Sequence, residues 1–377
     1  MKVQGKAATA RAIAITRGSP VFALGGAVRK AGVYVVLVAL VAFGAAQYPT
    51  FLSSENIDNI VTQAAPLVLA SLGMTFVLLS GEIDLSVGSL ISIVSVIVAN
   101  GMDGRDELIA PFLLLALAAG AANGLFNGLV TTQLRIPSFI VTLAMLLILQ
   151  GINLVWTAGG PSSTLAPSYD GFVSRTLLSI PVGAYVIVAA ALLVHFVLRR
   201  TYTGRLFVLI GSNARAVEVA GLPVARIRIM AFVLSGLFAS CAGVFLTSYV
   251  GSGQSWLGSG MELNAIAASV IGGADLFGGR GTAAGAVGGG LLLTVIFNLL
   301  IFMGVPSAYE PVATGLILLA GVALYLASDN PLKWRQAWRA ASDAVARFFP
   351  SRKLGGGDAA GAERGPRNGS GRDGSEA

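Results

Sequence analysis

The sequence predicts an all-α, polytopic membrane protein with about ten transmembrane helices, some of them short or broken. Hydrophobic residues make up 55% of the 377 residues and charged residues only 11%, whereas a soluble domain carries about 25% charged residues. The mean hydropathy of +0.79 is too high for a disordered chain. So little charge cannot cover a water-facing surface, so the composition excludes an ordinary soluble enzyme and leaves an integral membrane protein.

Apolar segments recur along most of the chain, and their lengths give the expected number of helices. A helix needs about 20 apolar residues to cross a hydrocarbon core of about 30 Å. The third and eighth segments, at 15 residues each, are short for a span. The predicted spans are residues 31–47, 57–80, 85–99, 108–130, 137–156, 181–198, 229–250, 263–277, 284–304 and 309–327.

The chain begins with a basic segment, residues 1–30, that contains six Lys or Arg residues and no acidic residue. A basic start before an apolar run is also found in signal peptides and in organellar transit peptides. Apolar segments continue, however, as far as residue 327. We therefore interpret residues 1–30 as a cytoplasmic basic tail and residues 31–328 as a transmembrane domain.

The basic residues gather on one predicted face of the membrane, as the positive-inside rule requires. With ten spans and a cytoplasmic N-terminus, 23 of the 25 Lys and Arg residues lie on the cytoplasmic side, and only Arg105 and Arg175 lie outside. This arrangement requires the short segments 85–99 and 263–277 to cross the membrane, unless a re-entrant hairpin elsewhere restores the parity. The net charge of +7 therefore reflects orientation, with both termini cytoplasmic, and predicts no nucleic-acid partner.

The C-terminal residues have two different compositions. Residues 329–350 place Trp334, Trp338, Val345 and Phe348 at helical spacing, with arginines between them. This pattern predicts an amphipathic helix that contacts membrane lipid at the cytoplasmic face. Residues 351–377 are rich in Gly, Arg and acidic residues, which predicts a disordered cytoplasmic tail.

Sequence motifs that bind ATP, metals or catalytic groups are missing. The chain has no Gly-x-x-x-x-Gly-Lys-[Ser/Thr] loop, no Gly-x-Ser-x-Gly and no His-Glu-x-x-His. The lone Cys241 excludes an intramolecular disulfide, and the lone His195 offers too few ligands for a metal site. We therefore expect no catalytic residue, no metal and no cofactor, and the chain is not expected to be an enzyme.

Carboxylates lie beside a glycine-rich break between the second and third spans. Placing the carboxylates of Glu82 and Asp84 in an apolar region costs free energy unless they face water or polar partners. Ser86 is a polar residue of the same stretch. Transporters build polar sites from such discontinuous helices, which makes these three residues candidates for a substrate pathway. A tight turn in which Asp84 or Ser86 caps the next helix explains the same residues.

Further polar residues within or beside the spans are candidates for the same pathway, because an uncharged, hydroxyl-rich solute needs polar lining. The alternative interpretation is hydrogen bonding between helices. Asp275 lies in a weak sequence repeat of the glycine-rich break, since Gly272-x-x-Asp275 has the same spacing as Gly81-x-x-Asp84. The other candidates are Asn123, Asn127, Gln150, Asn153, Asn264 and Asn298.

Glycines at four-residue spacing occur in two of the spans. Such spacing lets two helices approach closely in lipid. We interpret both series as packing surfaces rather than functional sites. The series are Gly120, Gly124 and Gly128, and then Gly281, Gly285 and Gly289.

A long basic segment, residues 199–228, separates the sixth and seventh spans. Its Ala-rich part ends in Gly221-Leu-Pro223, which predicts a short helix with its stop. A helix between two spans on the cytoplasmic side is a docking element for a partner. The alternative is that the basic residues only fix the orientation of the chain.

Four stretches, taken together, resemble the membrane permease of bacterial sugar ABC importers of the ribose, xylose and galactose type. The resemblance covers roughly residues 50–328. Each stretch alone is weak, but the four in this order on this topology are specific to the superfamily. They are Gly81–Ser89, Ile136–Pro161, Gly211–Gly221 continuing to Ser235-Gly236, and Glu262–Thr282.

The resemblance implies the permease subunit of an ATP-driven importer in a bacterial inner membrane, and we expect its neutral polar solute to be a monosaccharide. It also implies a homodimer that works with cytoplasmic ATP-binding subunits and an extracytoplasmic solute-binding protein. The chain departs from the family at Glu82, where Gly is common, so the surroundings of Asp84 are open to question. Residues implied to contact the ATPase are Asn213, Arg215, Glu218 and Gly221.

Other transport functions are alternatives to sugar import. Nucleosides and branched-chain amino acids are carried by related permeases. A secondary, ion-coupled transporter needs ionisable groups within the membrane, and only Asp84 and Asp275 lean toward the interior of the spans.

Overall fold

A computed structural model describes residues 20–161 and 165–329 of the chain. It confirms the all-α prediction, because the described residues form helices and only a two-stranded antiparallel hairpin of β1 (Thr176–Leu177) and β2 (Ile180–Pro181). The predicted tail 351–377, nearly all of the predicted helix 329–350 and most of the basic tail 1–30 lie outside the described residues. The chain divides into two compact units, Met1–Ala323 and Leu324–Ala377. The helices are α2 (Pro20–Gln47), α3 (Ser54–Leu79), α4 (Val87–Met102), α5 (Ile109–Gln133), α6 (Ser138–Thr157), α7 (Val182–Arg200), α8 (Tyr202–Val219), α9 (Val224–Val250), α10 (Met261–Ile271), α11 (Ala283–Phe302) and α12 (Glu310–Asp329).

Six helices in the described part of the chain are long and apolar enough to cross a membrane, namely α3, α5, α6, α7, α9 and α11. The apolar helices α4 and α10 are shorter. With 11 residues, α10 is about 16 Å long, against a hydrocarbon core of about 30 Å. Segment 263–277 is therefore one of the short or broken elements that the sequence predicted, because the helix ends at Ile271.

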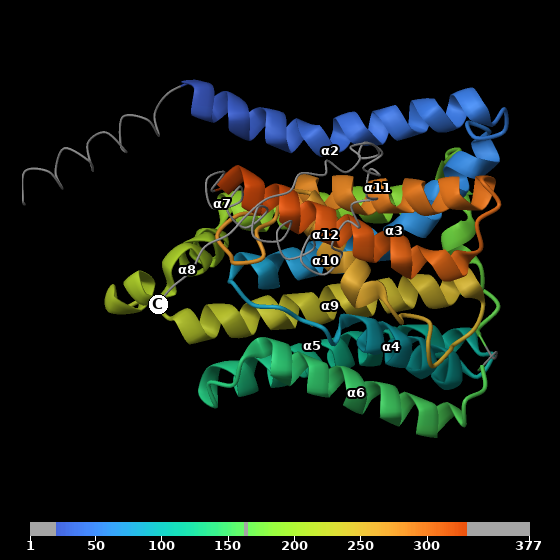
Figure 1. Ribbon diagram of the computed structural model, residues 1–377. Helices are drawn as coiled ribbons and strands as arrows, with labels where there is room; N and C mark the ends of the chain where they lie inside the picture. Colours follow the sequence, from blue (N-terminus) through green and yellow to red (C-terminus); the bar gives the residue numbers. More distant parts are fainter. Residues whose placement is uncertain (1–19, 162–164, 330–377) are drawn as a thin grey trace, which may run out of the picture. The chain divides into compact units, whose positions relative to one another are not determined.

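Helix α9 lies against α3, α4 and α5 (Figure 1). Its contact with α5 is close because the first glycine series faces it: a Cβ added at Gly124 would lie 2.2 Å from the carbonyl oxygen of Phe232. In the second series, Gly289 of α11 faces the backbone of α10 at Ala268, and Gly285 faces the backbone of Gly272 just after α10. Both series are thus packing surfaces, as predicted.

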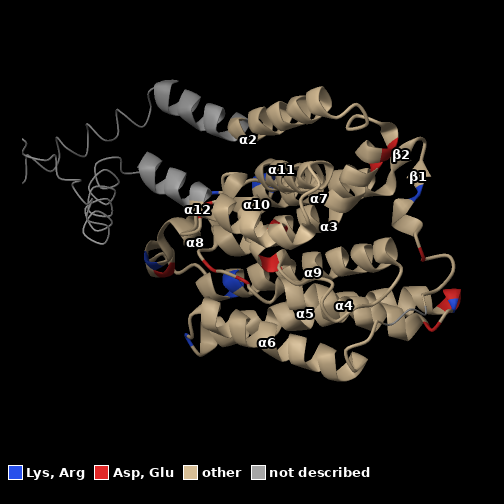
Figure 2. Cartoon of the chain, turned by 45° about the vertical axis from the view of Figure 1, so that its right-hand side comes forward, with Lys and Arg blue, Asp and Glu red and all other residues tan. Residues whose placement is uncertain are grey.

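The core of the first unit is built around α3, which is buried continuously from Ala64 to Leu79. The outer faces of α5, α6 and α7 instead expose large apolar side chains. Figure 2 shows most charged residues near the ends of the helices. An apolar surface between charged ends is what contact with lipid requires.

The chain between α9 and α10 passes along α4 without helical structure. Its backbone is instead bonded by serines of α4: the Ser92 hydroxyl accepts from the Gly258 N–H at 2.9 Å, and Ser95 accepts from the Gln254 N–H at 3.2 Å. Irregular backbone inside a membrane protein needs such partners because no water is present to satisfy it. The serines of α4 therefore hold the segment that leads into the short helix α10.

Candidate functional site

The first predicted break lies at the end of α3. Gly81 has a φ of 76°, and its N–H donates to the Leu78 carbonyl at 2.9 Å while the Glu82 N–H donates to Val77 at 3.1 Å. This is the Schellman arrangement that ends a helix at a left-handed glycine. Residues 80–86 then lead without helical structure to α4, and we call them the first break.

The second break, residues 272–282, has the same local construction at the end of α10. Gly273 has a φ of 92°, and the Ala274 N–H donates to the Ser269 carbonyl at 2.9 Å. An aspartate follows the glycine in both breaks and accepts an N–H two residues further on, at 2.9 Å for Asp275 and 3.0 Å for Asp84. The weak sequence repeat therefore corresponds to the same kind of turn in both breaks. The glycine with positive φ in the second break is Gly273, however, and not Gly272.

Asp84 is completely buried and accepts three hydrogen bonds. The N–H and hydroxyl of Ser86 donate to Oδ1 at 3.0 and 2.7 Å, and the Ser235 hydroxyl of α9 donates to Oδ2 at 2.9 Å. A buried carboxylate is costly unless donors surround it. These donors fix the first break against the middle of α9.

Two asparagines of α5 extend this cluster. Asn123 and Asn127 lie four residues apart and donate from Nδ2 to the Ser86 hydroxyl at 3.0 and 2.9 Å. Their Oδ1 atoms are buried without a hydrogen-bond partner. We call Asp84, Ser86, Asn123, Asn127 and Ser235 the buried polar cluster; the first four were predicted as site residues, and Ser235 was not.

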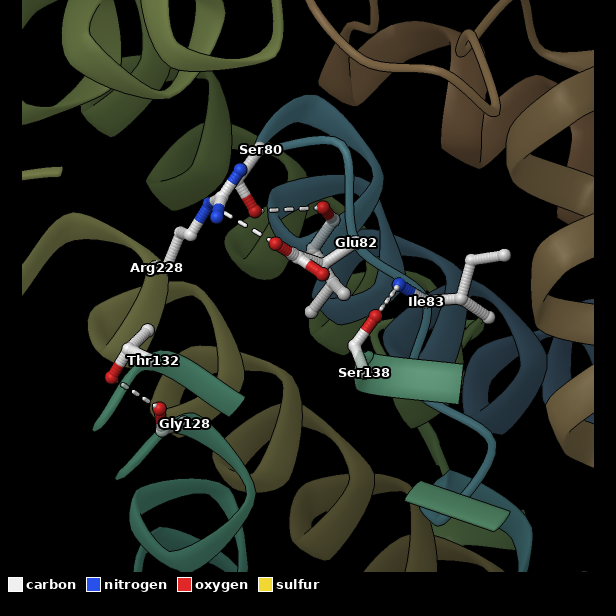
Figure 3. A network of polar contacts seen from close by, with 8 residues as sticks. Ser80, Glu82, Ile83, Gly128, Thr132, Ser138 and Arg228 are labelled. Carbon is white, nitrogen blue, oxygen red and sulfur yellow. Dashed lines mark hydrogen bonds and ion pairs between the residues drawn. The ribbon is translucent and has the colours of Figure 1, made fainter. Parts of the chain in front are cut away.

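Glu82 lies apart from this cluster, near the start of α9. Its Oε1 is 3.0 Å from Nε of Arg228, and Figure 3 shows the two side chains pointing toward each other. The next residue, Ile83, donates its N–H to the Ser138 hydroxyl of α6 at 3.2 Å. Glu82, where the chain departs from the family, therefore has a specific partner in Arg228, a pairing that the sequence did not predict.

The remaining predicted pathway residues are not brought together. Asn153 donates to the Ser255 carbonyl of the non-helical segment at 3.0 Å. Asn298 exchanges hydrogen bonds with Asn56 at 2.9 and 3.2 Å. Asn264 accepts from Thr314 at 2.8 Å, and Gln150 is exposed on α6. Asp275 is buried in the second break.

The predicted coupling residues lie in the last part of α8. Asn213 interrupts this helix with φ −163° and ψ 85°, and its Oδ1 accepts the Ala216 N–H at 3.0 Å, which starts a new helical turn. Arg215 and Glu218 form an exposed ion pair at 2.9 Å. Gly221, with φ 76°, ends the segment in another Schellman turn, and α9 follows.

The first part of α8 contacts both breaks. A Cβ added at Gly211 would lie 2.0 Å from the Leu79 carbonyl oxygen and 2.2 Å from the Gly279 nitrogen. The Gly279 N–H in turn donates to the Leu79 carbonyl at 3.0 Å. The helix that carries the exposed segment 214–219 therefore lies directly against the ends of both breaks.

Chemically, the site offers hydrogen bonds and one half-buried ion pair. In the part of the chain that the structure describes, no group of three or more His, Cys, Asp or Glu side chains is placed to hold a metal ion. Broken membrane helices joined to an exposed helix between two spans define a class of protein, the polytopic membrane permease.

The chain belongs to a particular permease family, since residues 56–322 match the family described as "Branched-chain amino acid transport system / permease component". It is 38% identical over 302 residues to the ribose import permease protein of Bacillus subtilis (strain 168), covering 79% of this chain and 93% of that protein. It is 33% identical to the autoinducer 2 import system permease protein of Enterobacter sp. (strain 638), covering 87% and 94%. It is 34% identical to the ribose import permease protein of Escherichia coli (strain K12), covering 76% and 91%.

No solved structure matches the chain. The family match and the apolar helices together make the chain a multi-pass membrane protein and the permease subunit of an ABC importer. Its class is therefore that of a transport permease subunit.

Proposed function

We propose that this permease imports a neutral, hydroxyl-rich solute, specifically a monosaccharide such as ribose. The observation that carries the proposal is the 38% identity to a ribose import permease across 79% of this chain. The buried polar cluster is consistent with it, because hydroxyl and amide groups bind an uncharged polar solute without requiring a counter-charge.

The proposed assembly has two copies of this chain, cytoplasmic ATP-binding subunits and an extracytoplasmic solute-binding protein in a bacterial inner membrane. Both termini lie on the cytoplasmic side, where the basic residues gather. The exposed segment 214–219 contacts the ATPase through Arg215 and Glu218. ATP-driven closure of the ATPase subunits moves this segment, and the breaks between α3 and α4 and between α10 and α11 change the access of the pathway.

Branched-chain amino acids are the second candidate substrate, because the family description names them. A zwitterionic amino acid needs partners for both of its charged ends, whereas a sugar needs hydroxyl contacts alone. The substrate candidates are therefore distinguished by the solute-binding protein encoded beside this chain.

The test is calorimetric titration of that binding protein with ribose, other pentoses, hexoses, inositols, leucine and isoleucine. We expect binding of a pentose or hexose in the micromolar range or tighter and no binding of the amino acids. Deletion of the permease is then expected to abolish uptake of the bound sugar. Binding of leucine or isoleucine alone would overturn the sugar assignment.

A further inference from the structure

Glu82 and Arg228 form a contact between the first break and α9, the helix that follows the exposed segment 214–219. We call this segment the coupling segment. They are separated by 3.0 Å, and their side chains are 11% and 29% exposed, respectively. Glu82 follows the last turn of α3, and Arg228 lies in the second turn of α9 (Figure 3). The ion pair therefore joins two segments that are far apart in the sequence.

The dipole of α3 does not favour a carboxylate at Glu82. A helix carries partial negative charge at its C-terminus, and Glu82 lies just past the C-terminal end of α3. Arg228 is in the second turn of α9, beyond the first turn in which that helix dipole acts. The 3.0 Å approach of Arg228 therefore supplies the opposite charge that Glu82 lacks at the end of α3.

The ion pair and a hydrogen bond both join the first break to one face of α9. Arg228 contacts Glu82, and Ser235 bonds Asp84 at 2.9 Å. Ser235 lies seven positions after Arg228 in α9, which is about two helical turns, or about 10 Å. A displacement of the start of α9 therefore acts on the break at Glu82 and on the buried polar cluster at Asp84.

The connection from the coupling segment to Arg228 is short and hydrogen-bonded. The Gly221 N–H donates to the Glu218 carbonyl at 2.9 Å, and the Leu222 N–H donates to Val217 at 3.2 Å. These bonds close the turn that leads from segment 214–219 directly into α9. The turn can therefore transmit a movement of the exposed segment to Arg228.

We propose that Arg228 is a positioning residue that transmits the movement of segment 214–219 to the first break through its ion pair with Glu82. This inference rests on the proposed function, because it assumes that an ATPase moves the segment. Arg228 acts through Glu82 and touches no solute. Loss of either charge is expected to uncouple ATP hydrolysis from transport without preventing assembly.

The test measures the number of ribose molecules imported per ATP hydrolysed in proteoliposomes that contain this chain, its neighbouring ATPase and its binding protein. Glu82→Gln and Arg228→Met are each expected to lower this ratio about five-fold. The double variant Glu82→Arg/Arg228→Glu is expected to restore it to within about two-fold, because the exchanged charges form the same ion pair in reverse. Arg135→Met, which removes an exposed arginine outside the coupling segment, is the matched control and is expected to keep the ratio.

A second measurement needs neither partners nor solute. Thermal unfolding of the detergent-solubilised chain is expected to show a lower Tm for each single variant and recovery in the exchanged pair. Unchanged ratios in the single variants, or an exchanged pair as impaired as the single variants, would overturn the inference. Failure of the unsubstituted complex to import ribose counts against the proposed function instead, while the Tm cycle still tests the ion pair.

Discussion

At the scale of single residues, the buried carboxylate of Asp84 is held by hydrogen bonds rather than by a cation in the described part of the chain. Its partners are Ser86 and Ser235. The sequence identified Asp84 and Ser86 because a carboxylate beside a glycine in an apolar region is unusual. It did not identify Ser235, which lies 151 positions away and becomes a partner only through the packing of α9.

Replacement of Asp84 by Leu is expected to destabilise the chain far more than replacement by Asn. Leucine leaves the Ser86 N–H and the Ser235 hydroxyl buried without an acceptor, at about 1–3 kcal/mol for each group. Asparagine keeps one oxygen as an acceptor at nearly the same volume. Thermal unfolding of the solubilised variants measures the difference, and equal Tm values for the two would show that the hydrogen bonds do not hold the break.

Tyr169 lies in the loop before β1, and its hydroxyl donates to the Val244 carbonyl of α9. Burial raises the pKa of this phenol well above its usual value. The folded state therefore holds the proton more tightly than the unfolded state, so this group's contribution to stability is complete below pH about 10 and declines at higher pH.

We expect Tyr169→Phe to leave unchanged the rise in absorbance at 295 nm between pH about 9 and about 11. Burial holds the pKa of Tyr169 above this range, so its phenol adds nothing to the rise while the chain stays folded. A smaller rise in the variant would mean that Tyr169 titrates as an exposed phenol and that the loop is open.

At the scale of secondary-structure elements, the sequence predicted the helices well and their interruptions less well. Hydrophobic length located α3, α9 and α11, and the glycine series correctly indicated close packing. The end of α10 was missed, because the apolar residues continue past Ile271 while the chain turns at Gly273. Asn153 shows the limit of reading polar residues singly, since its partner is a backbone carbonyl 102 positions away.

The packing of α5 on α9 is tested by Gly124→Leu. A side chain at this position meets the α9 backbone, so the helices must separate, and we expect a loss of about 1–3 kcal/mol or more. Gly151→Leu is the matched control, because nothing lies within 4 Å of a Cβ at this exposed position of α6. Comparison of the two Tm values checks the contact, and equal stability of both variants would contradict the close packing.

At the scale of the whole molecule, composition and charge distribution were sufficient to predict a multi-pass helical membrane protein. The permease family followed from four short stretches because their order and the topology agree. Packing and charge do not identify the substrate, since the described residues provide hydrogen-bonding groups that suit several neutral polar solutes. Packing and charge do not identify the partner proteins either. The transport function therefore has to be tested on the assembled complex.

The most direct measurement is uptake of labelled ribose into proteoliposomes that contain this chain together with the ATPase and the binding protein encoded beside it. We expect accumulation that requires ATP, the ATPase and the binding protein. We expect no accumulation in vesicles that contain this chain alone under an imposed proton gradient. Robust uptake driven by that gradient without the ATPase would contradict ATP-driven import and would identify a secondary transporter.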